Sequence, residues 1–110
     1  MEMQIVFPGD MQVDALAGDL VITTDQDGSA PSPFMLFLAS MGTCAGVYVL
    51  GFCKQRGLPT DGIRVIQRTH TDPLTRMVNK VEIDIQLPPD FPEQYKAAVV
   101  RSAELCAVRV

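Results

Sequence analysis

The amino-acid sequence predicts an α+β protein in which antiparallel sheets wrap around one buried central helix. Residues 34–53 contain no charged side chain, and a helix that is uncharged on every side must be covered by protein. Short runs before and after this stretch alternate apolar and polar residues with the period of β-strands. The chain has 110 residues, which fits a single domain over residues 1–110.

Three short strands are expected before the helix, at residues 4–7, 11–16 and 20–24, with turns at Pro8-Gly9-Asp10 and Gly18-Asp19. Residues 25–33 are rich in Asp, Gly, Ser and Pro and predict a loop. Asp25 and Asp27 have part of the spacing of a calcium-binding loop, but the later ligands are missing, so this segment is interpreted as a turn.

The long helix has clear start and stop signals. Ser32 is a good N-cap, and Pro33 suits the first helical position because its missing N–H costs nothing there. The helix is expected to reach about Arg56, with Gly57 ending it. A helix of this length could also cross a bilayer. Polar and glycine residues dilute its hydrophobicity, however, and we interpret it as a core helix.

Two further strands and a second helix are expected after the long helix. Residues 63–71 and 77–87 predict an antiparallel pair joined by residues 72–76. In the second strand, an apolar set alternates inward with polar residues outward: Val81, Ile83, Ile85 and Leu87. From Pro92 onward, one face of a helix carries Tyr95, Ala98, Val99, Ser102, Leu105 and Cys106.

The charge is distributed unevenly along the chain. Residues 1–53 carry six acidic and no basic side chains, whereas residues 54–110 carry nine basic and seven acidic ones. An acidic protein without a basic patch is unsuited to bind nucleic acid. The three cysteines include no CxxC pair, and the N-terminus lacks the pattern of a secretory leader. We therefore expect a cytoplasmic protein whose thiols are free or catalytic.

Two of the cysteines suggest redox chemistry. Cys44 lies in the middle of the uncharged stretch, and Cys106 lies on the apolar side of the second helix. Cys53 is about half a turn around the helix from Cys44, so it is expected only to fill space. A single histidine, His70, and three cysteines show no metal-ligand spacing, so we expect neither a metal site nor another cofactor.

The segment from Ala30 to Cys44, with a proline near the helix start and a cysteine at a fixed interval after it, resembles the OsmC/Ohr family. Similar matches follow at Lys54–Pro59, at Gly62–Val65 and around Cys106. The resemblance implies an OsmC-like fold in an intertwined homodimer. The chain ends four residues after Cys106, where the family continues, so we expect the natural protein to extend further.

The resemblance also implies a chemistry. Members with an assigned activity reduce organic hydroperoxides. By analogy, Cys44 attacks the peroxide to form a sulfenic acid, Cys106 condenses with it to a disulfide, and a dithiol reductant restores both thiols. The family activates the first cysteine with an N-terminal arginine and a glutamate at the helix start. This chain lacks both, and Phe34 and Met35 stand where the glutamate would be.

Several residues are candidates for stabilising the thiolate and for lining a substrate pocket. Arg64, Arg68 and His70 alternate on one side of a strand and could stabilise the thiolate, as could Arg76 or Arg109. Phe34, Leu38 and Met41 are expected to line an apolar substrate pocket. The alternative function is a non-enzymatic OsmC-like dimer that binds a hydrophobic small molecule or senses redox state. In either case we expect a homodimer that does not enter a membrane.

Overall fold

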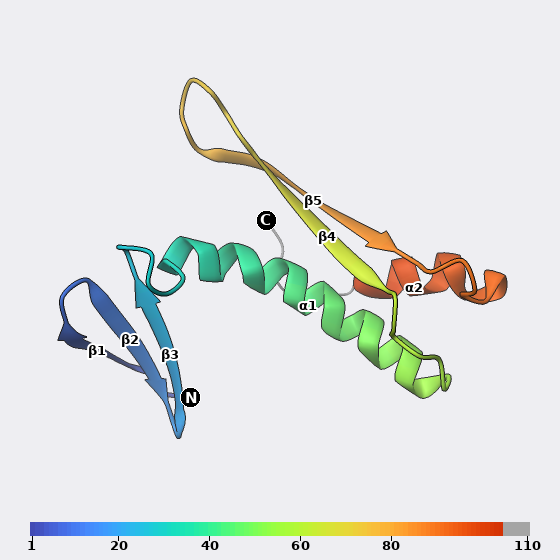
Figure 1. The fold of residues 1–110 in the computed structure, drawn as a ribbon, viewed down its shortest axis with the longest axis horizontal. Coiled ribbons are helices and arrows are strands. Elements are labelled where there is room, and N and C mark those ends of the chain that lie inside the picture. Colours follow the sequence, from blue (N-terminus) through green and yellow to red (C-terminus); the bar gives the residue numbers. More distant parts are fainter. Residues whose placement is uncertain (105–110) are drawn as a thin grey trace. The chain divides into compact units, whose positions relative to one another are not determined.

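The computed structural model describes residues 1–104, and its elements are drawn in Figure 1. It contains two compact units, one formed by residues 1–39 and the other beginning at residue 40. Helix α1 (Pro33–Gln55) is the continuous element that begins in the first unit and ends in the second.

The first unit contains a three-stranded antiparallel sheet. Its strands are β1 (Gln4–Gly9), β2 (Gln12–Ala17) and β3 (Leu20–Asp25), with β2 in the centre. The register places one apolar set of side chains on the same face: Ile5, Val13, Ala15, Ala17, Leu20 and Ile22. Ile5, Leu20 and Ile22 are exposed, so this unit does not cover its own apolar face.

The loop between β3 and α1 is held by short-range hydrogen bonds, as expected for a turn. The Asp25 carboxylate accepts hydrogen bonds from the Asp27 amide at 2.9 Å and from the Ser29 hydroxyl at 2.7 Å. These bonds lower the pKa of Asp25, the Ser29 bond most strongly. The amide of Asp25 also donates to the carbonyl of Pro31 at 3.0 Å. All four residues therefore fix where α1 begins.

Both ends of α1 confirm the sequence prediction. The amide of Met35 donates to the hydroxyl of Ser32 at 3.2 Å, which is the expected N-cap bond. At the other end Gly57 has a φ of +65°, a left-handed conformation that favours glycine. The next amide, of Leu58, returns to the carbonyl of Cys53 at 2.9 Å and closes the helix end.

The second unit contains a long hairpin of β4 (Arg64–Thr71) and β5 (Val78–Gln86). Its register separates two faces. The inner face carries Val65, Gln67, Thr69, Val81, Ile83 and Ile85, and the outer face carries Arg64, Ile66, Arg68, His70, Lys80, Glu82, Asp84 and Gln86. The predicted apolar alternation of β5 is thus confirmed, although Ile83 stays partly exposed.

The core of the second unit lies at the end of α1. Val49 and Cys53 of α1 pack there with Phe91 and with Val99 of α2 (Lys96–Ala103), and all four are buried. A 3₁₀ turn, η1 (Glu93–Tyr95), leads into α2. This cluster attaches α1 to the C-terminal elements.

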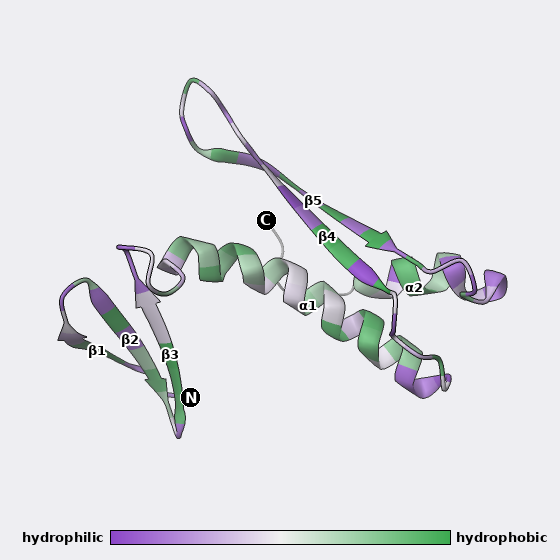
Figure 2. Ribbon diagram, in the orientation of Figure 1, coloured by the Kyte–Doolittle hydropathy of each residue, from purple (hydrophilic) through white to green (hydrophobic). Residues whose placement is uncertain are grey.

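Much of α1 is more exposed than its sequence predicts. Figure 2 shows hydrophobic residues along much of its length, and Phe37, Val47 and Leu50 are all exposed. The helix is long and apolar enough to cross a membrane, and 28% of its most apolar 18-residue stretch is buried inside the protein. A single described chain therefore does not provide the covering that the uncharged stretch requires.

The outer face of the hairpin makes one pH-dependent contribution to stability. His70 Nε2 lies 2.5 Å from Glu82 Oε1, and this bond, followed by the positive charge of Lys80, lowers the pKa of Glu82. A lowered carboxyl pKa stabilises the fold above the ordinary value of 4.5, and this stabilisation is lost as the pH falls through the folded-state pKa.

We therefore expect Glu82→Gln to flatten the acid limb of the stability curve. The melting temperature of the wild type should fall more steeply than that of the variant once the pH drops below about 4.5. Because both side chains are partly exposed, added salt should reduce the difference. Melting curves that stay parallel over this acid range would contradict the assignment.

Candidate functional site

Cys44 lies near the middle of α1 and is half-buried. It belongs to a disulfide, whereas Cys53 is a free thiol. Helical spacing places Met41 and Tyr48 on the same side of α1 as Cys44. Met41 is buried and Tyr48 is partly exposed, so the surroundings of the sulfur along the helix are largely apolar.

Cys53 is confirmed as a packing residue. Its side chain has no exposed area and lies in the core cluster of the second unit. Burial raises the pKa of its thiol, and the nearby charge of Arg56 opposes this only in part. A buried cysteine with a raised pKa is a poor nucleophile, which leaves Cys44 as the reactive candidate among the described cysteines.

Cys106 and Arg109 lie outside the described residues. Pairing of Cys44 with Cys106 therefore stays a prediction, and so does any part played by Arg109.

The three predicted pocket residues share one side of α1 by their spacing, but they differ in exposure. Met41 is buried, Leu38 is half-buried and Phe34 is exposed. Phe34 also stacks on Phe37, with ring centroids 6.2 Å apart. Apolar side chains are thus available near the start of α1, and their role as a substrate pocket stays a prediction.

The predicted thiolate-stabilising residues lie on the outer face of the hairpin, away from its apolar side. Arg68 contacts Asp84 at 3.7 Å, and His70 contacts Glu82. Arg64 is exposed on the same face. Two of these three side chains are thus occupied by acidic neighbours on β5. Arg76 lies in the hairpin loop with a φ of +60°.

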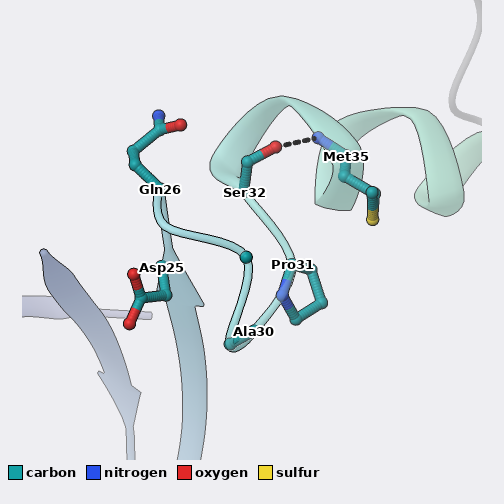
Figure 3. A pocket seen from close by; sticks show the side chains of 7 residues that line it. Asp25, Gln26, Ala30, Pro31, Ser32 and Met35 are labelled. Carbon is teal, nitrogen blue, oxygen red and sulfur yellow. Dashed lines mark hydrogen bonds between the residues drawn. The ribbon is translucent and has the colours of Figure 1, made fainter.

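A pocket of about 370 Å³ lies at the start of α1. Figure 3 shows Asp25 at the end of β3, and Ala30 and Pro31 of the following loop, beside Ser32 and Met35 at the helix start. Its lining includes no cysteine, histidine or basic residue, and none of the predicted pocket residues contributes to it. The pocket therefore offers neither a nucleophile nor a cation.

Within residues 1–104, no group of three or more His, Cys, Asp or Glu side chains could hold a metal ion. One polar residue that sequence reasoning did not single out lies against α1, two residues before Cys44. Gln67 is on the inner face of β4, and its side chain lies against Gly42 of α1. A long polar side chain in the same phase of the strand as Val65 was the available signal.

These features define an α+β protein whose central helix carries a disulfide-forming cysteine in apolar surroundings. The model of the OsmC-like protein family matches residues 26–109, and the chain belongs to this family. No curated protein sequence matches it.

Three solved structures show the similarity of the fold. A hypothetical protein from Aquifex aeolicus VF5 has a TM-score of 0.76 at 18% identity, covering 97% of this chain and 82% of its own. A Psychrobacter arcticus 273-4 protein, named for osmotic stress induction and detoxification, has a TM-score of 0.73 at 22% identity, covering 96% and 83%. The organic hydroperoxide resistance protein OhrB of Bacillus subtilis has a TM-score of 0.55 at 17% identity, covering 97% and 87%.

Proposed function

We propose that the protein is a thiol-dependent peroxidase that reduces bulky, apolar organic hydroperoxides. The Cys44 thiolate attacks the outer peroxide oxygen, the O–O bond breaks, and the products are an alcohol and a sulfenic acid on Cys44. The thiol of Cys106 displaces water from the sulfenic acid to form a disulfide. An external dithiol then reduces this disulfide and is itself oxidised.

The observation that carries the proposal is the disulfide-bonded state of Cys44 in a chain of the OsmC-like family. A catalytic cycle of this kind must pass through such a state. The contrast with Cys53, which is free and buried, supports a specific role for Cys44 over a general tendency to oxidise. The apolar side chains on α1 support the choice of an apolar peroxide.

The arrangement of the basic residues favours one alternative, a dimer that binds a hydrophobic molecule or senses redox state. Arg68 and His70 are engaged by Asp84 and Glu82. A thiol that gains no cation stays mostly protonated at neutral pH and reacts slowly. The alternative therefore keeps the cysteine pair but lacks rapid turnover.

The two functions are separated by a turnover assay on the purified protein. We expect consumption of cumene hydroperoxide over many cycles when a dithiol such as dihydrolipoamide is present. Hydrogen peroxide, which is small and polar, should be consumed more slowly. A single equivalent of peroxide consumed per protein, with no further turnover, would instead establish the redox-sensing alternative.

The exposed apolar surfaces support a homodimer. On α1, Val47 and Leu50 are exposed, with Val47 at 63%. In the sheet of the first unit, Ile5 and Leu20 are exposed on one face. Monomeric soluble proteins rarely expose so many large apolar side chains, and a second copy would cover them. A cytoplasmic location also stays a prediction.

We expect Val47→Asp to weaken the homodimer strongly, because a carboxylate buried in an apolar interface has no partner to compensate for lost hydration. Light scattering should report a dimer for the wild type and monomers or aggregates for the variant. Gln55→Asp, at the exposed polar end of the same helix, is the matched control and should remain dimeric. A wild-type protein that is monomeric at all concentrations would contradict the proposal.

A further inference from the structure

The inner face of the β4–β5 hairpin contains a polar residue where an apolar one would serve packing better. Gln67 lies between Val65 and Thr69 on this face and pairs with Ile83 across the hairpin. It is half-buried. A long amide side chain loses rotamer freedom when it is ordered, and burying it also costs hydration. Its position therefore calls for a specific contact.

The end of this side chain lies against the backbone of α1 at Gly42. A Cβ atom built on Gly42 would lie closer than 3.0 Å to Gln67 Oε1, and it would lie 3.6 Å from Cδ and 3.9 Å from Cβ of the same side chain. Real Cβ atoms essentially never come that close to another heavy atom. The amide of Gln67 thus occupies the space that any other residue at position 42 would need.

The next glycine of α1 provides an internal comparison. Gly46 lies two residues after Cys44, just as Gly42 lies two residues before it. A Cβ atom on Gly46 would meet nothing within 4 Å in the described chain. The structure therefore shows that the space at Gly42, unlike that at Gly46, is filled by Gln67 of the same chain.

We propose that Gln67 is a positioning residue for Cys44, because its amide rests on Gly42 and sets the helical turn that carries the thiol. Residues two apart in a helix point in widely different directions, so Gln67 acts through the helix backbone and is not a catalytic residue. The proposal rests on the proposed function of Cys44 as the reactive thiol. It adds a residue of β4 to those that determine the reactivity of the Cys44 thiol.

The expected size of the effect follows from the geometry of thiol reactions. Attack on a peroxide requires the sulfur, the outer oxygen and the leaving oxygen to be aligned, and a displacement of about 1 Å can cost up to about a hundredfold in rate. The atom nearest to Gly42 is the end of a flexible side chain. Gly42→Ala should therefore displace the amide of Gln67 without preventing folding.

The test measures the reactivity of Cys44 in the fully reduced full-length protein. Iodoacetamide is added at a series of pH values, and alkylation of Cys44 is followed by mass spectrometry of its peptide. Gly42→Ala is compared with Gly46→Ala, since both changes add the same methyl group and gain the same helix propensity. We expect the rate constant for Cys44 to fall by about threefold to tenfold in Gly42→Ala and to change little in Gly46→Ala.

Variants of Gln67 test whether the amide is responsible. Gln67→Leu should lower the rate constant as much as Gly42→Ala does. The double variant should be no slower than either single variant, because the two substitutions remove the same contact between Gln67 and Gly42. Gln67→Glu keeps the shape but adds a negative charge, so the pH midpoint of alkylation should move upward. A purely structural role for Gln67 would change the melting temperature and leave the alkylation rate constant of Cys44 unchanged in Gln67→Leu.

The outcomes separate this inference from the proposed function. Unchanged Cys44 reactivity in Gly42→Ala and Gln67→Leu, or additive losses in the double variant, would overturn the positioning role. If Gly42→Ala fails to fold, the two Gln67 variants decide the question alone. Wild-type protein that consumes no peroxide but shows the expected alkylation pattern would overturn the peroxidase and leave the positioning role intact.

Discussion

Replacing Cys44 with serine is expected to reduce dithiol-dependent consumption of cumene hydroperoxide to the uncatalysed rate. Serine has nearly the same shape, but its hydroxyl does not ionise near neutral pH and cannot form a sulfenic acid or a disulfide. Because Cys44 is half-buried on α1, the substitution should leave the fold and the melting temperature almost unchanged. Loss of activity would then report chemistry and not unfolding.

The other two cysteines make this experiment specific. Cys53→Ser should retain the activity, since Cys53 is a free, fully buried thiol, although a buried hydroxyl without an assured partner should lower stability. Cys106→Ser should stop the cycle after one turnover, with a sulfenic acid that dimedone can trap on Cys44. Peroxidase activity that survives in Cys44→Ser would remove Cys44 from the mechanism, and activity that disappears in a folded Cys53→Ser variant would give Cys53 a chemical role as well.

Local signals in the sequence predicted the described elements of the fold well. The N-cap at Ser32, the stop at Gly57 and the alternation along β5 all appear in the structure as expected. Each depends on interactions within a few residues of the chain or on a strict period. For the same reason, the Asp25–Asp27 segment was correctly predicted as a turn.

The candidate site was harder to predict because it depends on long-range placement. The strand period correctly put Arg64, Arg68 and His70 on one side of β4, but it could not say which side faces α1. In the structure these residues lie on the outer face, where Arg68 contacts Asp84 and His70 contacts Glu82. The contact between Gln67 and Gly42 could not be predicted either, since the two residues are separated along the chain by a helix end, a loop and part of a strand.

The position of Phe91 in the core could not be predicted from local sequence patterns either. It follows two prolines after β5 and lies in no helix or strand, so periodicity gave no signal for it. In the structure its amide donates to the carbonyl of Pro88 at 3.0 Å, and this turn directs the ring into the cluster with Val49, Cys53 and Val99. It is the largest side chain of that cluster, and it joins α1 to α2.

We therefore expect Phe91→Ala to destabilise the protein by about 3–5 kcal/mol, the usual cost of removing a buried phenylalanine. Small domains have a total stability of about 5–15 kcal/mol, so the loss would be a large fraction of it. Urea unfolding followed by circular dichroism would measure the change, and the slope of the transition would show whether unfolding stays cooperative.

Leu74→Ala is the matched control, because it also removes a large apolar side chain but from the hairpin loop, where Leu74 is 92% exposed. Its effect should stay within about 0.5 kcal/mol. A comparable loss in both variants would mean that stability depends on total hydrophobicity and not on this cluster. A small loss in Phe91→Ala alone would mean that α1 is attached to the C-terminal elements by other contacts, and that the core lies elsewhere along the helix.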